Sequence, residues 1–96
     1  MIRQGDLFFV KTEEIPSDAQ PIEGGVIARG EATGHTHRVR SGTGIALMVA
    51  GVTYVRALAE AFVDHQEHST IILPPGNWEV FRQREYTPKG WVRVDD

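Results

Sequence analysis

Short runs of β-branched and aromatic residues, separated by glycine and proline, recur along the whole chain. Such residues fit the pleated surface of a strand, and closely spaced turn residues are typical of a small sandwich or barrel. The pattern predicts strands or extended segments at residues 7–11, 26–29, 35–40, 45–49, 52–56, 70–73, 78–85 and 91–94, with turns at 41–44, 50–51 and 74–77. We therefore expect an all-β fold of about seven to nine short strands.

The stretch 57–64 is ambiguous. Apolar residues at Val55, Leu58 and Phe62 have helical spacing, whereas Val55, Ala57 and Val63 belong to an alternating series. Valine and isoleucine together number 17 against four leucines, which favours strand here and in the chain as a whole.

Length and charge narrow the class of protein. With 96 residues the chain is expected to form a single β domain over residues 1–96. Its net charge of -3 argues against a general binder of nucleic acid or of an anionic membrane, and the absence of cysteine excludes thiolate metal ligands. The longest apolar run, residues 45–52, is far shorter than the roughly 20 residues of a spanning helix. We expect a soluble, cytoplasmic protein.

All four histidines fall in two clusters, His35 with His37 and His65 with His68. On an extended segment His35 and His37 project from one face, so they can converge on one point. In a turn, His65 and His68 approach each other; in a strand, His65 and Glu67 share a face instead. Three or four imidazole and carboxylate ligands suit a divalent metal ion, and zinc is the first candidate. The alternative is that the histidines are solvated or brace two loops.

A second candidate site lies on residues 78–86, where one face changes from apolar to polar. Arg82, Arg84 and Tyr86 follow Trp78 and Val80 on that face. Guanidinium groups bind carboxylate or phosphate, so these residues predict a pocket for a small anionic ligand. The alternative is an exposed strand end. The candidate ligand-binding residues are Arg38, Arg82, Arg84 and Tyr86, with Arg38 placed beside the first histidine cluster.

Several segments together resemble a family of small uncharacterised bacterial and phage proteins. The segments are Gln4-Gly5-Asp6, residues 30–39, His65-Gln66-Glu67-His68, residues 72–76 and residues 82–86. The resemblance implies no activity and favours strand at 57–64. A weaker resemblance is to the cupins, because Gly30 precedes His35 and His37 and because Pro75-Gly76 is similar to part of the second cupin motif. It implies a β-barrel metal site, although the cupin glutamate is missing.

Three functions from different classes fit these features. The first is a metal-binding β domain that also binds an anion. The second is an assembly or interaction module, such as a phage or bacterial accessory protein that forms a homo-oligomer or part of a larger assembly. The third is a metal-independent nuclease in which two histidines act as acid and base. Catalysis is left open, and the acidic pI with two lysines counts against the nuclease.

Overall fold

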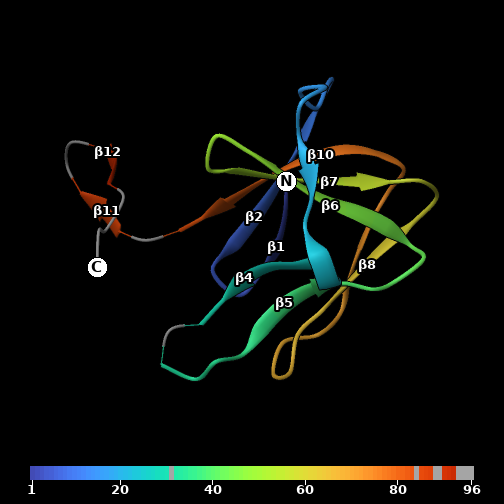
Figure 1. Ribbon diagram of the computed structural model, residues 1–96. Coiled ribbons are helices and arrows are strands. Elements are labelled where there is room, and N and C mark those ends of the chain that lie inside the picture. The colour runs from blue at the N-terminus through green and yellow to red at the C-terminus, as the bar shows by residue number, and fades with distance from the viewer. Residues whose placement is uncertain (31, 84, 88–89, 93–96) are drawn as a thin grey trace.

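The alternating runs of the sequence form antiparallel strands in the computed structural model, which describes residues 1–30, 32–83, 85–87 and 90–92, the last two ranges as backbone. The strands arrange into two packed sheets and one hairpin (Figure 1). Their bounds are β1 Ile2–Gln4, β2 Leu7–Thr12, β3 Gln20–Pro21, β4 Val26–Arg29, β5 Thr36–Val39, β6 Gly44–Val49, β7 Val52–Ala57, β8 Ala61–Asp64, β9 Ile71–Leu73, β10 Gly76–Arg82, β11 Glu85–Thr87 and β12 Gly90–Val92.

The larger sheet has six strands in the order β1-β2-β10-β7-β6-β3, and the smaller has four in the order β4-β5-β8-β9. Every paired strand is antiparallel. A short 3₁₀ turn, η1 (Glu23–Gly25), leads from the larger sheet to the smaller. Hairpin β11–β12 pairs only with itself among the described strands, and Figure 1 shows it apart from the two sheets.

One hydrophobic core lies between the two sheets. Phe9 and Val55 of the larger sheet and Val63 and Leu73 of the smaller are completely buried. Burying each such side chain contributes about 1.5–3 kcal/mol to the free energy of unfolding. The remaining core residues are Leu7, Ile27, Val39, Ala46, Ala57, Ala61 and Trp78. The fold is therefore a β-sandwich whose inner faces come from the alternating positions of the strands.

The expected all-β class is confirmed, and the described residues contain no α-helix. The turn at 50–51 is confirmed, and Ala50 and Gly51 both have positive φ, as a tight hairpin turn requires. The ambiguous stretch contains strand β8, as favoured, preceded by a bend at 58–59. Two details differ: β10 begins at Gly76, inside the expected turn, and ends at Arg82. Strands β1 and β3 were not anticipated because they are only three and two residues long.

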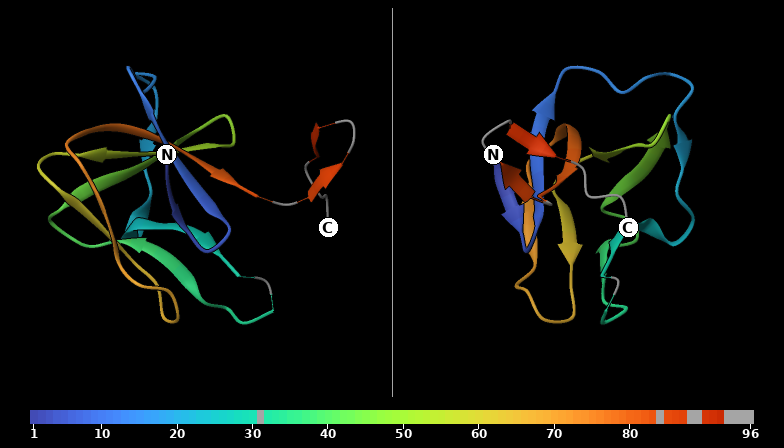
Figure 2. Two further views of the ribbon diagram at one scale, coloured as in Figure 1. Left: turned by 180° about the vertical axis from the view of Figure 1, so that it is seen from behind. Right: turned by 90° about the vertical axis from the view of Figure 1, so that its left-hand side faces the viewer.

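Three segments meet at one end of the sandwich. They are the turn between β1 and β2, the loop entering β5, and the loop 65–70 between β8 and β9. In Figure 1 and in both views of Figure 2 the two loops lie at the lower end of the molecule. No helix in the described residues is long and apolar enough to span a membrane.

Candidate functional site

The four imidazole rings gather at this end, around His65. The centroid of the His65 ring lies 5.6 Å from that of His35, 4.4 Å from that of His37 and 4.6 Å from that of His68. The rings of His37 and His68 are 6.4 Å apart. Residues 65–68 form a turn, so the turn geometry applies to the second cluster and the strand geometry does not.

His37 is the buried member of the cluster, and Gln4 fixes its tautomer. The amide nitrogen of Gln4 donates to the carbonyl oxygens of Val63 and Ser69, at 2.8 and 2.9 Å. Both amide hydrogens are thereby used, so the amide oxygen must face His37 Nδ1, 2.8 Å away. The hydrogen-bond network therefore assigns the proton to Nδ1 and leaves a lone pair on Nε2.

The free nitrogen of His37 faces a carboxylate. His37 Nε2 lies 3.7 Å from Asp6 Oδ1, and the His37 side chain is only 5% exposed. Burial lowers the pKa of His37 to about 4, helped by the nearby His65 and opposed by the charge of Asp6. At neutral pH His37 is consequently uncharged. Two hydrogen-bond acceptors then face each other, with no proton between them.

His65 has the opposite tautomer. Its Nδ1 accepts hydrogen bonds from the backbone N–H groups of Glu67 and His68, at 3.0 and 3.1 Å. These bonds close the 65–68 turn and leave the proton of the neutral ring on Nε2. Burial, with the neighbouring His68 and His35, lowers the pKa of His65. His65 can therefore donate a hydrogen bond, but it has no free lone pair for a metal.

The two remaining rings lie at the outside of the cluster. His35 Nδ1 is 3.1 Å from Glu67 Oε1, so these two candidate ligands are paired with each other. His68 is exposed and lies against Gly5, whose φ is +58°. A Cβ at Gly5 would come within 2.8 Å of His68 Nε2, so any other residue would displace this ring, and the positive φ itself favours glycine.

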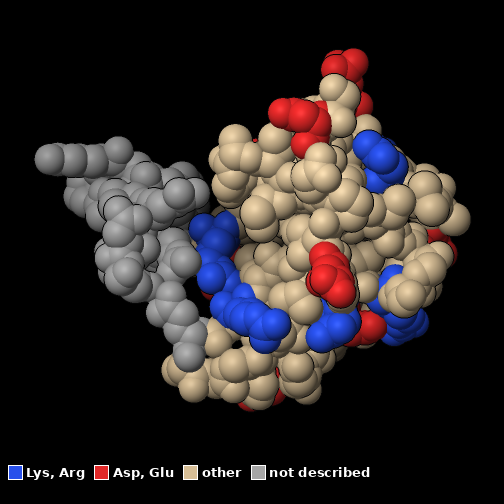
Figure 3. All heavy atoms as spheres, in the orientation of Figure 1, with Lys and Arg blue, Asp and Glu red and all other residues tan. Residues whose placement is uncertain are grey.

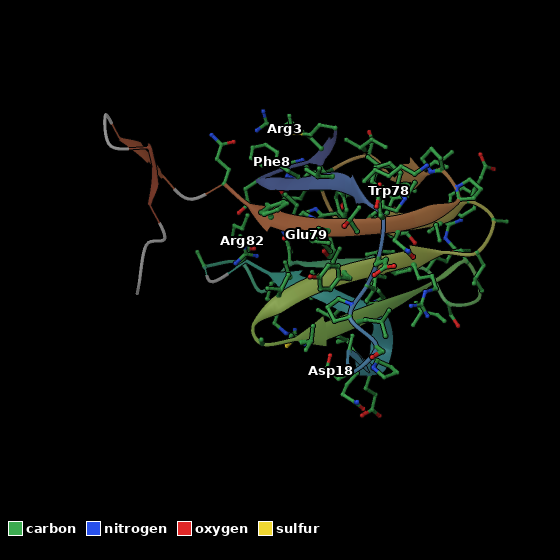
Figure 4. All side chains as sticks on the ribbon, turned by 90° about the horizontal axis from the view of Figure 1, so that it is seen from above. Arg3, Phe8, Asp18, Trp78, Glu79 and Arg82 are labelled. Atoms are coloured by element: carbon green, nitrogen blue, oxygen red, sulfur yellow. The ribbon has the colours of Figure 1, made fainter. Side chains whose placement is uncertain are left out.

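Arg82 connects the site to β4. Its Nη2 donates to the Arg29 carbonyl oxygen at 2.9 Å, and Figure 4 shows the side chain leaving the end of β10 toward this strand. Its Nε lies 3.3 Å from Asp6 Oδ2. The Nε atom is nevertheless buried and has no hydrogen-bond acceptor among residues 1–30 and 32–83, so the ion pair leaves this N–H unused. The expected change of face along β10 is present, since Trp78 is buried and Arg82 reaches the site.

The other predicted residues are placed differently. Arg38 lies outside the cluster and donates to the Gly24 carbonyl oxygen at 3.1 Å. The side chains of Arg84 and Tyr86 lie outside the described residues. Among those that are described, no three His, Asp or Glu side chains are arranged so that they could hold a metal ion. Metal binding by the histidines and Glu67, with zinc as the ion, and formation of an oligomer or assembly therefore stay predictions.

Sequence reasoning missed two residues of the site, Gln4 and Asp6. Gln4 is 3% exposed, although a glutamine at the edge of a short strand gives no periodic signal of burial. Asp6 is held by its backbone, whose carbonyl oxygen accepts from the Gln83 N–H at 2.7 Å. In the sequence, Gln4-Gly5-Asp6 is part of the family resemblance, and this is the signal that could have found them.

Comparison with known proteins gives a family without an assigned activity. A family model described as a domain of unknown function, DUF8820, matches residues 3–83. This range contains Gln4, Asp6, all four histidines and Arg82. Searches of curated proteins and of solved structures gave no match. The resemblance to cupins finds no support in these comparisons.

Proposed function

The chain belongs to the DUF8820 family of domains of unknown function, and from its own side chains we propose that it binds a divalent metal ion between His37 and Asp6. The observation that carries the proposal is the facing pair of acceptors, His37 Nε2 and Asp6 Oδ1. Both atoms bear lone pairs, and Gln4 prevents the imidazole from turning its N–H toward the carboxylate. A cation between them removes this repulsion.

The separation of the two atoms suits a metal. Bonds of about 2.1 Å to two atoms that are 3.7 Å apart enclose an angle of about 124°, which is wider than the tetrahedral angle of about 109° but within reach of a distorted four-ligand site. Imidazole nitrogen and carboxylate oxygen are ligands that zinc accepts. The low pKa of His37 helps, because protons do not compete for Nε2 at neutral pH. The Gln4 hydrogen bond orients the ring in the way that outer partners orient metal-binding histidines.

His68 is the third ligand in this proposal. Its ring is exposed, lies beside Gly5, and makes no side-chain hydrogen bond to residues 1–30 or 32–83 that would hold it in place. The proposal requires a rotation of this side chain to bring one of its ring nitrogens to the ion. His65 remains outside the ligand set because its Nδ1 closes the 65–68 turn.

The test measures metal affinity in Asp6→Asn. Asparagine keeps the size of the side chain and the backbone bond from Gln83, so the variant is expected to fold. Isothermal titration with Zn²⁺ should give one site in the wild type and at least about tenfold weaker binding in Asp6→Asn. Asp18→Asn is the matched control, since Asp18 lies on the loop before β3, far from Arg82 in Figure 4. Equal Zn²⁺ affinity in wild type and Asp6→Asn, or no binding to either, would overturn the proposal.

A further inference from the structure

We propose that the metal ion at His37 and Asp6 holds an oxyanion, the carboxylate or phosphate group of a small ligand, and that Arg82 binds the same group. This inference rests on the proposed metal site and names what the site takes. Its starting point is the shortage of ligand atoms on the protein. His37 and Asp6 are in place, whereas His65 Nδ1 and His35 are engaged by the 65–68 turn and by Glu67.

Divalent ions bind at least four ligands, so positions beyond His37, Asp6 and His68 must be filled from outside the chain. The charge of the site selects the ligand that fills them. The positive charge of Arg82 offsets the negative charge of Asp6, whose Oδ2 lies 3.3 Å from Arg82 Nε, and an imidazole that binds a metal ion is itself uncharged. The full charge of the ion therefore remains to attract an anion.

Hydrogen-bond donors at the site are also unused. Arg82 Nε is a buried donor without a hydrogen-bond acceptor among residues 1–30 and 32–83, although Asp6 is close. The neutral tautomer of His65 carries a second donor, on Nε2. An oxyanion bound to the ion presents further oxygens, which are the acceptors that guanidinium and imidazole N–H groups require.

The surface around Arg82 is cationic. Arg82 donates a hydrogen bond to the backbone carbonyl oxygen of Arg29 in β4, so the two arginines lie at the same edge of the sandwich. In the space-filling view, Lys and Arg atoms form a continuous group over the place where β10 ends and β4 passes (Figure 3). An anionic ligand thus approaches the site past positive charge, which raises the rate of association.

The experiment uses Co²⁺ as the ion, because its visible absorption reports changes of ligand. The Co²⁺-loaded protein is titrated with acetate and with methylphosphonate, and acetamide serves as the neutral control. We expect both oxyanions to change the spectrum and acetamide to leave it unchanged. The stronger response identifies the chemical group: acetate points to a carboxylate ligand, and methylphosphonate to a phosphate ligand.

Arg82→Gln distinguishes a binding role from a structural one. Removing this charge frees Asp6, so Co²⁺ should bind as tightly as in the wild type or more tightly. The oxyanion should bind about tenfold more weakly or worse, because a charge-assisted hydrogen bond is lost. Arg56 of β7 lies opposite Asn77, at the other end of β10 from Arg82, so Arg56→Gln removes the same charge and should change neither affinity.

Each outcome has one meaning. Unchanged or tighter Co²⁺ binding together with weaker oxyanion binding in Arg82→Gln supports the inference. Normal Co²⁺ binding without any response to oxyanions, or with the same response in Arg82→Gln, overturns the oxyanion site and leaves the metal site standing. Absence of Co²⁺ binding to the wild type overturns the metal site and the oxyanion site together.

Discussion

The buried, uncharged state of His37 predicts that the protein loses stability between pH 6.5 and pH 4. In the unfolded chain the imidazole takes up a proton below about pH 6.5. In the folded protein burial lowers its pKa to about 4, so folding at intermediate pH excludes that proton. The free energy of unfolding is therefore full above pH 6.5 and decreases as the pH falls toward 4.

The expected size of the loss follows from the two pKa values. A change from 6.5 to about 4 at about 1.4 kcal/mol per pKa unit corresponds to about 3 kcal/mol. Small domains unfold with about 5–15 kcal/mol, so the loss is a large part of the total. His65 acts in the same direction, because its pKa is also lowered. Asp64, whose pKa is lowered by hydrogen bonds from Arg40 and Thr70, adds its effect only at more acidic pH.

Urea unfolding at several pH values between 7.5 and 4, without added metal, measures this loss. His37→Asn should reduce the slope, since an asparagine amide can donate to Gln4 and does not titrate. His35→Asn is the matched control and should change the slope much less, because His35 does not shift the pKa of His37 and acts only through His65. A free energy of unfolding that stays constant from pH 7.5 to 4, or an equal slope in His37→Asn, would refute the reasoning.

Two further substitutions test the hydrogen bonds and the packing around the cluster. Gln4→Leu should lower the free energy of unfolding by about 2–4 kcal/mol, because buried partners of the amide lose their hydrogen bonds; chemical denaturation measures this, and ¹⁵N NMR of His37 should show a mixture of tautomers. An unchanged stability with a single tautomer would contradict the role of Gln4. Gly5→Ala should cost about 1–2 kcal/mol because φ is +58°, and should shift the NMR signals of His68, whose ring would have to move. Unaltered His68 signals would contradict the close approach.

The strands could be predicted from the sequence because they are buried on alternate positions. In β10 the alternation reaches from Trp78 to Arg82 and correctly places both side chains on one face. Strands β1 and β3 could not be predicted, because two or three residues are too few to show a period of two. The pairing of β1 with β2 depends on the turn at Gly5. The positive φ of this glycine is a feature of the backbone, which the pattern of apolar and polar side chains does not show.

The candidate site was predictable in its residues and not in its chemistry. The spacing of the histidines indicates that they can meet, and the four rings lie together. Their tautomers depend on partners that are far away in the sequence or on the backbone. The tautomer of His37 is fixed by Gln4, which is 33 residues away, and the tautomer of His65 is fixed by the backbone N–H groups of its own turn. No local pattern distinguishes an imidazole that offers a lone pair from one that offers a proton.

The clamp formed by Gln4 has a consequence for the order of events during folding. Gln4 belongs to β1 in the larger sheet, while Val63 belongs to β8 in the smaller, and 59 residues separate them. Contacts between such distant positions form only after long loops have closed, so the His37 site is expected to assemble late. A ligand that binds only the assembled site slows unfolding and leaves the folding rate nearly unchanged. Occupancy of this site would therefore lengthen the lifetime of the native state.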